Sequence, residues 1–330
     1  MSSDYQLSKK LSVAPMMDWT DRHYRYFIRL ISKCALLYTE MVTSGAVIHG
    51  DREKLLGYSQ QEHPIALQLG GSDPKALAEC AKIAEDYGYD EININVGCPS
   101  DRVQSGKIGA CLMAEPELVA ECVAAMKNAT KLPVTVKHRI GIEGGGLPTI
   151  DSYESLAAFV GTVAAAGCRS FTVHARIAVL TGLSPKQNRE VPPLKYDFVY
   201  QLKQDFPELE ISLNGGIKSL AETREHLRHL DGVMIGREAY QNPYCLAGAD
   251  QSIFAKSFSQ TSRIEVAEQM IEYVERHIAS GGKLQHISRH MLGLFHAQPN
   301  GKQWRRYLSE MATRPDANAQ VLIEAINIVS

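Results

Sequence analysis

Short apolar runs recur along the chain and alternate with segments of helical periodicity. Eight runs have the length and composition of buried strands: Leu11–Pro15, Ala35–Thr39, Pro64–Leu69, Glu91–Asn95, Pro133–Lys137, Ser170–His174, Glu210–Asn214 and Asp231–Ile235. Several segments between them have the apolar spacing of helices: Pro74–Tyr87, Pro116–Asn128, Tyr153–Ala166 and Leu220–Leu227. Strands that alternate with helices predict right-handed β-α-β units in a parallel sheet, and eight of them close most naturally into a barrel.

The predicted fold class is therefore α/β, an eight-stranded parallel β/α (TIM) barrel. An open doubly wound sheet is the alternative with the same order of elements. It is disfavoured because no G-x-G-x-x-G sequence follows the first run.

The strand pattern ends near residue 255, and helical segments follow. Residues Ser262–Glu265 have the sequence of a capping box, and the helix they begin should stop at Gly281. Three further helical segments are expected: Gln285–Ala297, Gly301–Ala312 and Asp316–Ile328. We predict two domains, a catalytic barrel over residues 1–255 and a small C-terminal helical bundle over residues 256–330.

The composition narrows the class of protein. The chain has 330 residues, 45% of them hydrophobic, and no apolar stretch approaches the ~18 residues of a membrane span. The first residues lack the pattern of a signal peptide, so we expect a soluble, cytoplasmic protein. The seven cysteines are scattered, without the close pairs of a zinc or disulfide framework, and we expect no metal. The net charge of -2 means that a nucleic-acid partner would have to meet a local basic patch.

Polar or reactive residues follow the ends of the apolar runs. In chain order they are Pro15-Met16-Met17, Glu40, Gln68, Asn95 with Cys98, Lys137 with Arg139, His174 with Arg176, Asn214-Gly215-Gly216, and Gly236-Arg237. Barrel enzymes place their chemistry at the carboxyl ends of the strands, so we interpret these residues as one active site.

The last two loops are typical of a phosphate site. Glycines in the Asn214–Gly216 loop let backbone N–H groups approach phosphate oxygens, and Arg237 adds a cation. Taken alone, Asn-Gly-Gly is equally compatible with an ordinary tight turn. Lys137 is compatible with two functions: the Schiff-base lysine of an aldolase, or a cation that stabilises a reduced flavin. In the second case Gln68 could form hydrogen bonds to the edge of the flavin ring.

Eight segments together resemble the tRNA-dihydrouridine synthase family, and specifically its A subfamily. They are Val13–Asp21, Tyr38–Met41, Gln68–Gly71, Asn93–Ser100, Val136–Gly141, His174–Arg176, Gly182–Arg189 and Asn214–Ile217. The resemblance covers nearly the whole chain. It implies an FMN-dependent enzyme that uses NADPH to reduce specific D-loop uridines of tRNA, at positions 20 and 20a, to 5,6-dihydrouridine.

The resemblance also implies roles for residues. Those that would hold the flavin ring are Pro15, Met16, Met17, Gln68, Lys137 and His174, and those at its phosphate are Asn214, Gly215, Gly216, Gly236 and Arg237. Asn95 would face the uracil. Saturation of the C5=C6 bond needs a hydride and a proton, and a thiol that is mostly protonated at neutral pH makes Cys98 the expected proton donor.

The chain departs from the family pattern in two places. Ile177 and Val179 stand where we expect a lysine and a bulkier side chain, and Gly144–Pro148 looks inserted. Both should change the rim of the site.

The helical tail contains no acidic residue between Glu275 and Glu310. The stretch holds Lys283, Arg289, Lys302, Arg305 and Arg306, together with Trp304 and Tyr307. A solvated face is one reading. We prefer an RNA-binding track, with tRNA contacts from Arg176, Lys186, Arg189, Lys302 and Arg305.

Two other functions fit part of the pattern. An FMN-dependent reductase of free pyrimidines or dihydroorotate would share the barrel and the acid but would not need the tail. An RNA-binding protein with a vestigial flavin site would not need Cys98 and Lys137. We expect a monomer.

Overall fold

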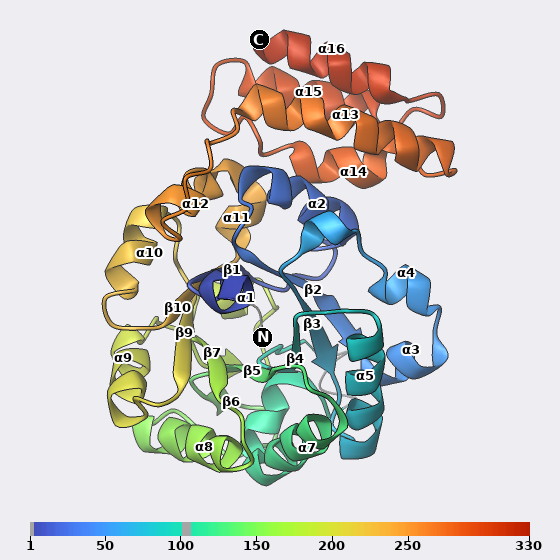
Figure 1. Cartoon of the computed structure of the whole chain (residues 1–330). Coiled ribbons are helices and arrows are strands. Elements are labelled where there is room, and N and C mark those ends of the chain that lie inside the picture. Colours follow the sequence, from blue (N-terminus) through green and yellow to red (C-terminus); the bar gives the residue numbers. More distant parts are fainter. Residues whose placement is uncertain (1–2, 101–106) are drawn as a thin grey trace.

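The computed structural model describes residues 3–100 and 107–330 and contains a closed barrel of eight parallel strands (Figure 1). The barrel strands are β1 (Leu11–Val13), β2 (Leu36–Thr43), β3 (Ile65–Gly70), β4 (Glu91–Val96), β5 (Val134–Arg139), β7 (Ser170–His174), β9 (Glu210–Asn214) and β10 (Gly232–Ile235). Each pairs with the next barrel strand in the chain, and β10 closes the ring onto β1. All eight predicted strands are confirmed, although β2 continues to Thr43 instead of ending at Thr39.

Helices surround the barrel. The α-helices of this layer are α2 (Arg22–Ile31), α3 (Ser44–His49), α4 (Arg52–Leu56), α5 (Pro74–Asp86), α7 (Pro116–Ala129), α8 (Tyr153–Ala165), α9 (Tyr196–Asp205), α10 (Leu220–His226), α11 (Arg237–Gln241) and α12 (Ala249–Ser252). Short 3-10 turns add η1 (Gln60–Glu62), η2 (Gly109–Ala114), η3 (Gln187–Arg189) and η4 (Pro243–Leu246). The four helices predicted between strands are confirmed, and side chains such as Asp73 and Ser152 cap their first turns.

Helix α1 (Ser3–Ser8) lies across the amino-terminal end of the barrel, in front of the strands in Figure 1. Its Tyr5 packs with Leu36, Tyr38 and Met234 in a small apolar cluster that is separate from the main core. The main core lies outside the strands, between them and the surrounding helices. Helix α1 therefore closes the end of the barrel opposite the carboxyl ends of the strands.

Four helices follow the barrel and pack together at one side of it (Figure 1). They are α13 (Arg263–Ala279), α14 (Leu284–Met291), α15 (Gly301–Met311) and α16 (Ala319–Val329). The predicted capping box is confirmed, because Ser262 and Glu265 exchange side-chain and backbone hydrogen bonds at the start of α13.

Two details of the tail differ from the sequence analysis. Helix α14 ends at Met291, short of the predicted Ala297, and turns fill the connection to α15. Trp304 is fully buried against Phe295, and its Nε1 donates to the Met291 carbonyl at 3.0 Å. The expectation that Trp304 belongs to an RNA-binding surface was therefore wrong, because this ring fills the core of the helical region.

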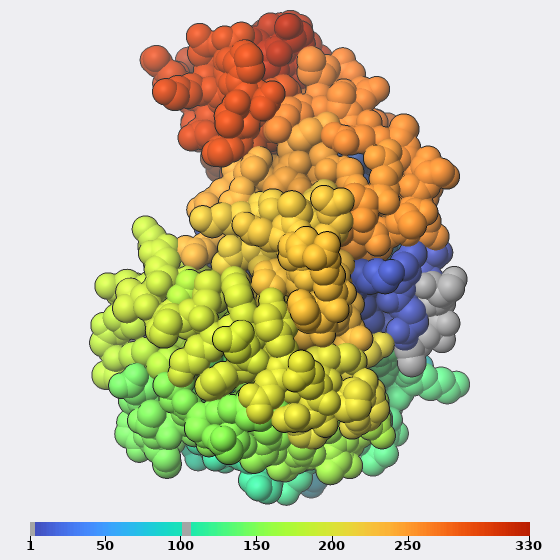
Figure 2. Space-filling model, turned by 90° about the vertical axis from the view of Figure 1, so that its left-hand side faces the viewer, coloured from blue at the N-terminus to red at the C-terminus, as the bar shows by residue number. Residues whose placement is uncertain are grey.

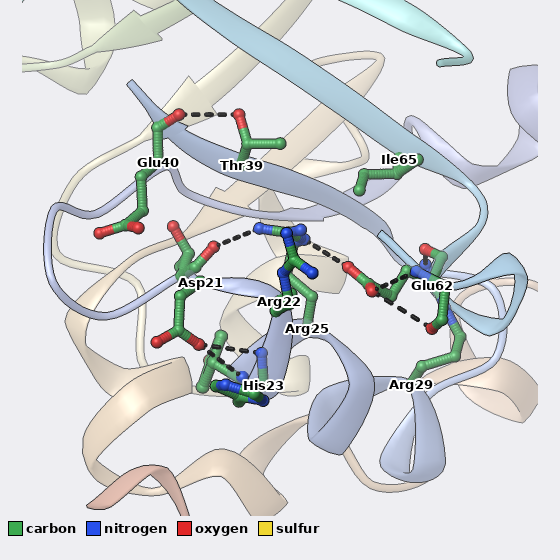
Figure 3. Close-up of polar contacts among 12 residues, drawn as sticks. Asp21, Arg22, His23, Arg25, Arg29, Thr39, Glu40, Glu62 and Ile65 are labelled. Atoms are coloured by element: carbon green, nitrogen blue, oxygen red, sulfur yellow. Dashed lines mark hydrogen bonds and ion pairs between the residues drawn. The ribbon is translucent and has the colours of Figure 1, made fainter. Parts of the chain in front are cut away.

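Helix α2 packs against α13 and α14, and Figure 3 shows polar side chains at its start and along it, among them Asp21, His23 and Arg25. Asp21 caps α2 by accepting the backbone N–H groups of His23 and Tyr24. On the same helix, buried Arg25 donates to Glu62 at 2.6 Å and thereby holds the segment that enters β3. The Asp21 carboxylate also contacts α14, where His290 Nε2 lies 3.0 Å from Asp21 Oδ2. Burial opposes ionisation, yet the His290 contact and the backbone donors lower the pKa of Asp21 to about 2.

Within the described part of the chain, no helix is both long enough and apolar enough to cross a membrane.

Candidate active site

The structure brings the predicted strand-end residues to one end of the barrel, because the strands are parallel and all their carboxyl ends meet there. We call this ring of residues the barrel rim. It contains Pro15, Met16, Met17, Gln68, Asn95, Cys98, Lys137, His174, Arg176, Asn214, Gly215, Gly216, Gly236 and Arg237. Lys186 and Arg189 lie in the loop after β7, whereas Lys302 and Arg305 lie on α15.

Lys137 supplies a cation that has no counter-charge within the described ranges of the chain. The side chain keeps partial exposure, but its ammonium is surrounded by protein atoms. Burial and the neighbouring Arg139 lower the pKa of Lys137 to about 7, while Cys98 opposes this shift. Among the described residues Lys137 has no hydrogen-bond or ion-pair partner. An unpaired ammonium of this kind is stabilised when an anion or a strong hydrogen-bond acceptor binds beside it.

His174 lies at the end of the neighbouring strand β7 and is buried. Burial, followed by the charges of Arg139 and Lys137, holds the pKa of His174 well below its ordinary value. The imidazole is therefore neutral at neutral pH. Gly215 packs directly on this ring: a Cβ added there would lie 2.7 Å from His174 Cδ2, and its φ of +114° disfavours other residues.

The Cys98 loop is fixed by backbone hydrogen bonds. The Asn95 side-chain oxygen accepts the N–H groups of Gly97 at 3.0 Å and Cys98 at 2.9 Å. From the other side Arg139 donates to the Gly97 carbonyl at 3.2 Å. The half-buried Cys98 thiol is 3.5 Å from the Ser100 hydroxyl. Asn95 and Arg139 thus hold the thiol-bearing loop in place.

A surface cavity of about 420 Å³ lies next to this loop. It is lined by Pro99 and Ser100 on one side and by Leu180 and Gly182–Pro185 on the other. A cavity of about 470 Å³ lies at the opposite end of the barrel, near Lys9 and Glu210, away from the reactive side chains. We therefore assign the chemistry to the rim.

Two of the predicted phosphate residues, Arg237 and Asn214, form hydrogen bonds to neighbouring loops and strands. Arg237 forms an ion pair with Glu190 and donates to the Arg189 carbonyl at 3.2 Å. The Asn214 amide donates to the Met234 carbonyl at 2.8 Å and so ties β9 to β10. At Gly236 an added Cβ would make only an ordinary contact, 3.8 Å from the Ala14 Cβ, so no protein atom crowds the backbone there.

Two arginines predicted to contact the substrate, Arg176 of the rim and Arg189 of the loop after β7, differ in their contacts. Arg176 donates to the carbonyls of Glu190 and Pro192, which folds the loop after β7 back onto the barrel. The buried Nε atoms of Arg176 and Arg189 have no hydrogen-bond partner in the part of the chain that the structure describes. Lys186, Lys302 and Arg305 are exposed.

Sequence reasoning gave no role to Arg139. Its guanidinium donates to the carbonyls of Gly97, Ile177 and Asn188 and thereby joins the Cys98 loop to the loop after β7. The available signal was the alternation Thr135, Lys137, Arg139, which places all three side chains on the inner face of β5.

Sequence reasoning also missed a two-stranded sheet at the rim. Strands β6 (Ile142–Glu143) and β8 (Ala178–Val179) pair in parallel. The two departures from the family pattern meet here, because Val179 pairs with Glu143 and Gly144–Pro148 follows directly. Gly145 N–H donates to Thr181 at 2.9 Å. The residues of both expected departures therefore lie side by side at the rim.

No group of three or more His, Cys, Asp or Glu side chains is placed to hold a metal ion within residues 3–100 and 107–330.

A closed β/α barrel with reactive side chains on its carboxyl-end rim defines an α/β-barrel enzyme. The chain belongs to the dihydrouridine synthase (Dus) family, which it matches over residues 12–329. It is 61% identical over 316 residues to the tRNA-dihydrouridine(20/20a) synthase of Shewanella oneidensis, covering 96% of this chain and 92% of the relative. It is 58% identical over 329 residues to the enzyme of that name from Escherichia coli (strain K12), covering 99% and 94%.

Among solved structures, morphinone reductase in complex with tetrahydroNAD has a similar fold, with a TM-score of 0.53. The identity is 12%, and the match covers 79% of this chain and 92% of that one. This likeness concerns the barrel fold alone.

Proposed function

We propose that this protein reduces uridine in tRNA to 5,6-dihydrouridine, with FMN as bound cofactor and NADPH as electron donor. The observation that carries the proposal is a match to the Dus family over residues 12–329, together with a rim that presents Cys98 beside Lys137, which pairs with no other residue that the structure describes. The names of the relatives point to positions 20 and 20a of the tRNA.

The rim fits FMN in two respects. Lys137 lacks a counter-charge among the described residues, as expected of a site completed by an electron-rich ligand. At Gly236, next to Arg237, no protein atom crowds the backbone, and the arginine can supply a charge-assisted contact to a phosphate. On this proposal Pro15, Met16, Met17, Gln68, Lys137 and His174 surround the flavin ring, and Asn214, Gly215, Gly216, Gly236 and Arg237 bind the phosphate.

Bound FMN would supply the hydride for C6 of uracil, with NADPH as the source of electrons. The chain itself supplies the proton: Cys98 holds it at Sγ and delivers it to C5, so that one hydride and one proton saturate the double bond. Lys137 stabilises negative charge on the reduced cofactor. Asn95 orients the uracil and, through its contacts to Gly97 and Cys98, the acid as well.

We further propose that residues 1–255 form the catalytic domain and residues 256–330 the tRNA-binding domain. Figure 2 shows a hollow between the C-terminal helices in red and the yellow-green part of the barrel. On the barrel side of this hollow, Arg176, Lys186 and Arg189 would contact tRNA phosphates. On the α15 side, the exposed Lys302 and Arg305 would do the same. One extruded base does not identify its neighbours, so contacts to the tRNA backbone must select the uridine.

The deciding experiment is mass spectrometry of tRNA nucleosides from a strain that lacks this gene, complemented with wild type or with Cys98→Ala. We expect dihydrouridine only with wild type. Turnover of free uracil or dihydroorotate by the purified protein, with no dihydrouridine restored in tRNA, would instead establish a reductase of free pyrimidines.

The tRNA surface is tested separately by replacing Lys186, Arg189, Lys302 and Arg305 together with Ala. The apparent KM for tRNA should rise and its salt dependence should flatten, because phosphate contacts release counterions on binding. NADPH oxidation by the bound flavin should not change. An unaltered KM and salt slope would assign these residues to an ordinary solvated surface.

A further inference from the structure

A row of polar side chains fills one side of the barrel interior below the rim. Strand β4 contributes Glu91, Asn93 and Asn95, which alternate with Ile92 and Ile94 and therefore point to the same face. Gln68 of β3 pairs in register with Asn93, and Asn93 pairs with Thr135 of β5. Glu91 and Asn93 are fully buried, and Gln68 and Thr135 nearly so.

A continuous line of hydrogen bonds joins the Cys98 loop to Glu91. The N–H groups of Gly97 and Cys98 donate to Asn95 Oδ1, and Asn95 Nδ2 donates to Gln68 Oε1 at 2.7 Å. Gln68 Nε2 donates to Asn93 Oδ1 at 2.8 Å, and Asn93 Nδ2 donates to Thr135 Oγ1 at 2.8 Å. Thr135 Oγ1 donates to Glu91 Oε1 at 2.7 Å. We call Asn95, Gln68, Asn93, Thr135 and Glu91 the Glu91 chain.

The direction of the Glu91 chain follows from its two ends. Backbone N–H groups are donors only, so Asn95 must turn its oxygen toward Gly97 and Cys98 and its amide nitrogen toward Gln68. Gln68 must then accept from Asn95 and donate to Asn93, and Asn93 must accept from Gln68 and donate to Thr135. The Thr135 hydroxyl accepts from Asn93 and is left to donate to Glu91. At the far end the Glu91 carboxylate accepts from Thr135 and Tyr38 at Oε1 and from Tyr5 at Oε2, at 2.5 to 2.7 Å.

We propose that the Glu91 chain positions Gln68 and, through Asn95, the Cys98 loop for proton delivery, with Asn93 and Thr135 as positioning residues. This inference rests on the function proposed above. Each amide of the chain could rotate by 180°, and a buried amide keeps one orientation only if both of its ends are matched. Glu91 provides the acceptor that makes one orientation of Gln68 and Asn95 the stable one.

Breaking the Glu91 chain at Thr135 should loosen this orientation. Thr135→Val keeps the shape of the side chain but leaves the buried Asn93 Nδ2 without its acceptor. The amides above it can then flip, and a flipped Asn95 turns a donor toward the N–H groups of Gly97 and Cys98. Proton delivery should slow, whereas tRNA binding on the outer surface should not change.

The test compares Thr135→Val with Thr135→Ser, which retains the hydroxyl, and with Tyr5→Phe, which removes a hydroxyl from Glu91 Oε2, the oxygen that Thr135 does not contact. FMN-loaded enzyme is first reduced with NADPH and then mixed with unmodified tRNA, and dihydrouridine formation is followed over a single turnover. We expect Thr135→Val to be slower by about tenfold, the equivalent of one buried hydrogen bond, with unchanged flavin reduction and unchanged apparent KM for tRNA. Thr135→Ser and Tyr5→Phe should be close to wild type.

Two results would overturn the proposal: a Thr135→Val rate equal to wild type, or an equal slowing in all three variants, which indicates loss of packing alone. If Thr135→Val does not fold, Asn93→Leu replaces it, because this change removes the acceptor of Gln68 Nε2. The same slowing of dihydrouridine formation is then expected, with unchanged flavin reduction. Wild-type enzyme that forms no dihydrouridine would contradict the proposed function instead, so the two failures are distinguishable.

Discussion

Replacing Lys137 with Met should stabilise the FMN-free protein although it removes a residue proposed to act on the cofactor. The ammonium of Lys137 is surrounded by protein and lies near Arg139, with no partner among the described residues. Burial, and then Arg139, lower its pKa from 10.5 to about 7. Below pH 10.5 the folded protein must either keep a buried ammonium or give up its proton, and both lower the free energy of unfolding; the uncharged Met avoids this loss.

The size of the effect follows from the pKa shift. One pKa unit corresponds to about 1.4 kcal/mol, so the change from 10.5 to about 7 sets an upper limit of about 5 kcal/mol. Lys137 keeps partial exposure and solvent screens part of this, so we expect about 2 kcal/mol. For a chain of 330 residues that gain raises Tm by about 3 °C.

The pH dependence provides the stricter test. The unfolded chain binds a proton at Lys137 below about pH 10.5 and the folded chain below about pH 7. Between these values the unfolded state holds the extra proton, so wild-type stability rises with pH and the advantage of Lys137→Met shrinks. Thermal unfolding of FMN-free protein at pH 7, 8 and 9 measures this, with Lys302→Met on the exposed face of α15 as control. A variant no more stable than wild type at pH 7, or a constant advantage up to pH 9, would refute the reasoning.

Three further outcomes are expected. Cys98→Ala should retain FMN and its reduction by NADPH but form dihydrouridine at least about 100-fold more slowly, because only the proton donor is lost; a wild-type rate would make Cys98 structural. Arg237→Ala should weaken FMN binding about tenfold, whereas Glu190→Gln, which releases Arg237 from its ion pair, should strengthen it in the same titration. Burial lowers the pKa of His23 from 6.5 to about 4, and the charge of Asp21 opposes this shift. The stability that neutral His23 provides is therefore complete above pH 6.5 and is lost as the pH falls through 4. His23→Gln should make Tm less dependent on pH over that range.

Local pattern was enough to predict the barrel and most of its rim. Each barrel strand is a short apolar run, and helices such as α5 begin at a capping residue and a proline that can be read directly from the chain. A parallel barrel then places every strand end on one rim, so Gln68, Lys137 and His174 could be grouped before their positions were known. These features depend on neighbours within a few residues, and such neighbours are visible in the sequence.

Contacts between distant segments were decided only by the tertiary structure. Trp304 has the sequence neighbours of an RNA-contacting ring, but the bend after α14 buries it against Phe295. Arg237 stands beside a glycine as phosphate-binding arginines do, yet the loop after β7 brings Glu190 to it. Likewise, Glu91 and Asn93 read as polar interruptions of a strand. Their role depends on Thr135 and Gln68 from the adjacent strands, because a buried polar group is stable only where packing supplies its partner.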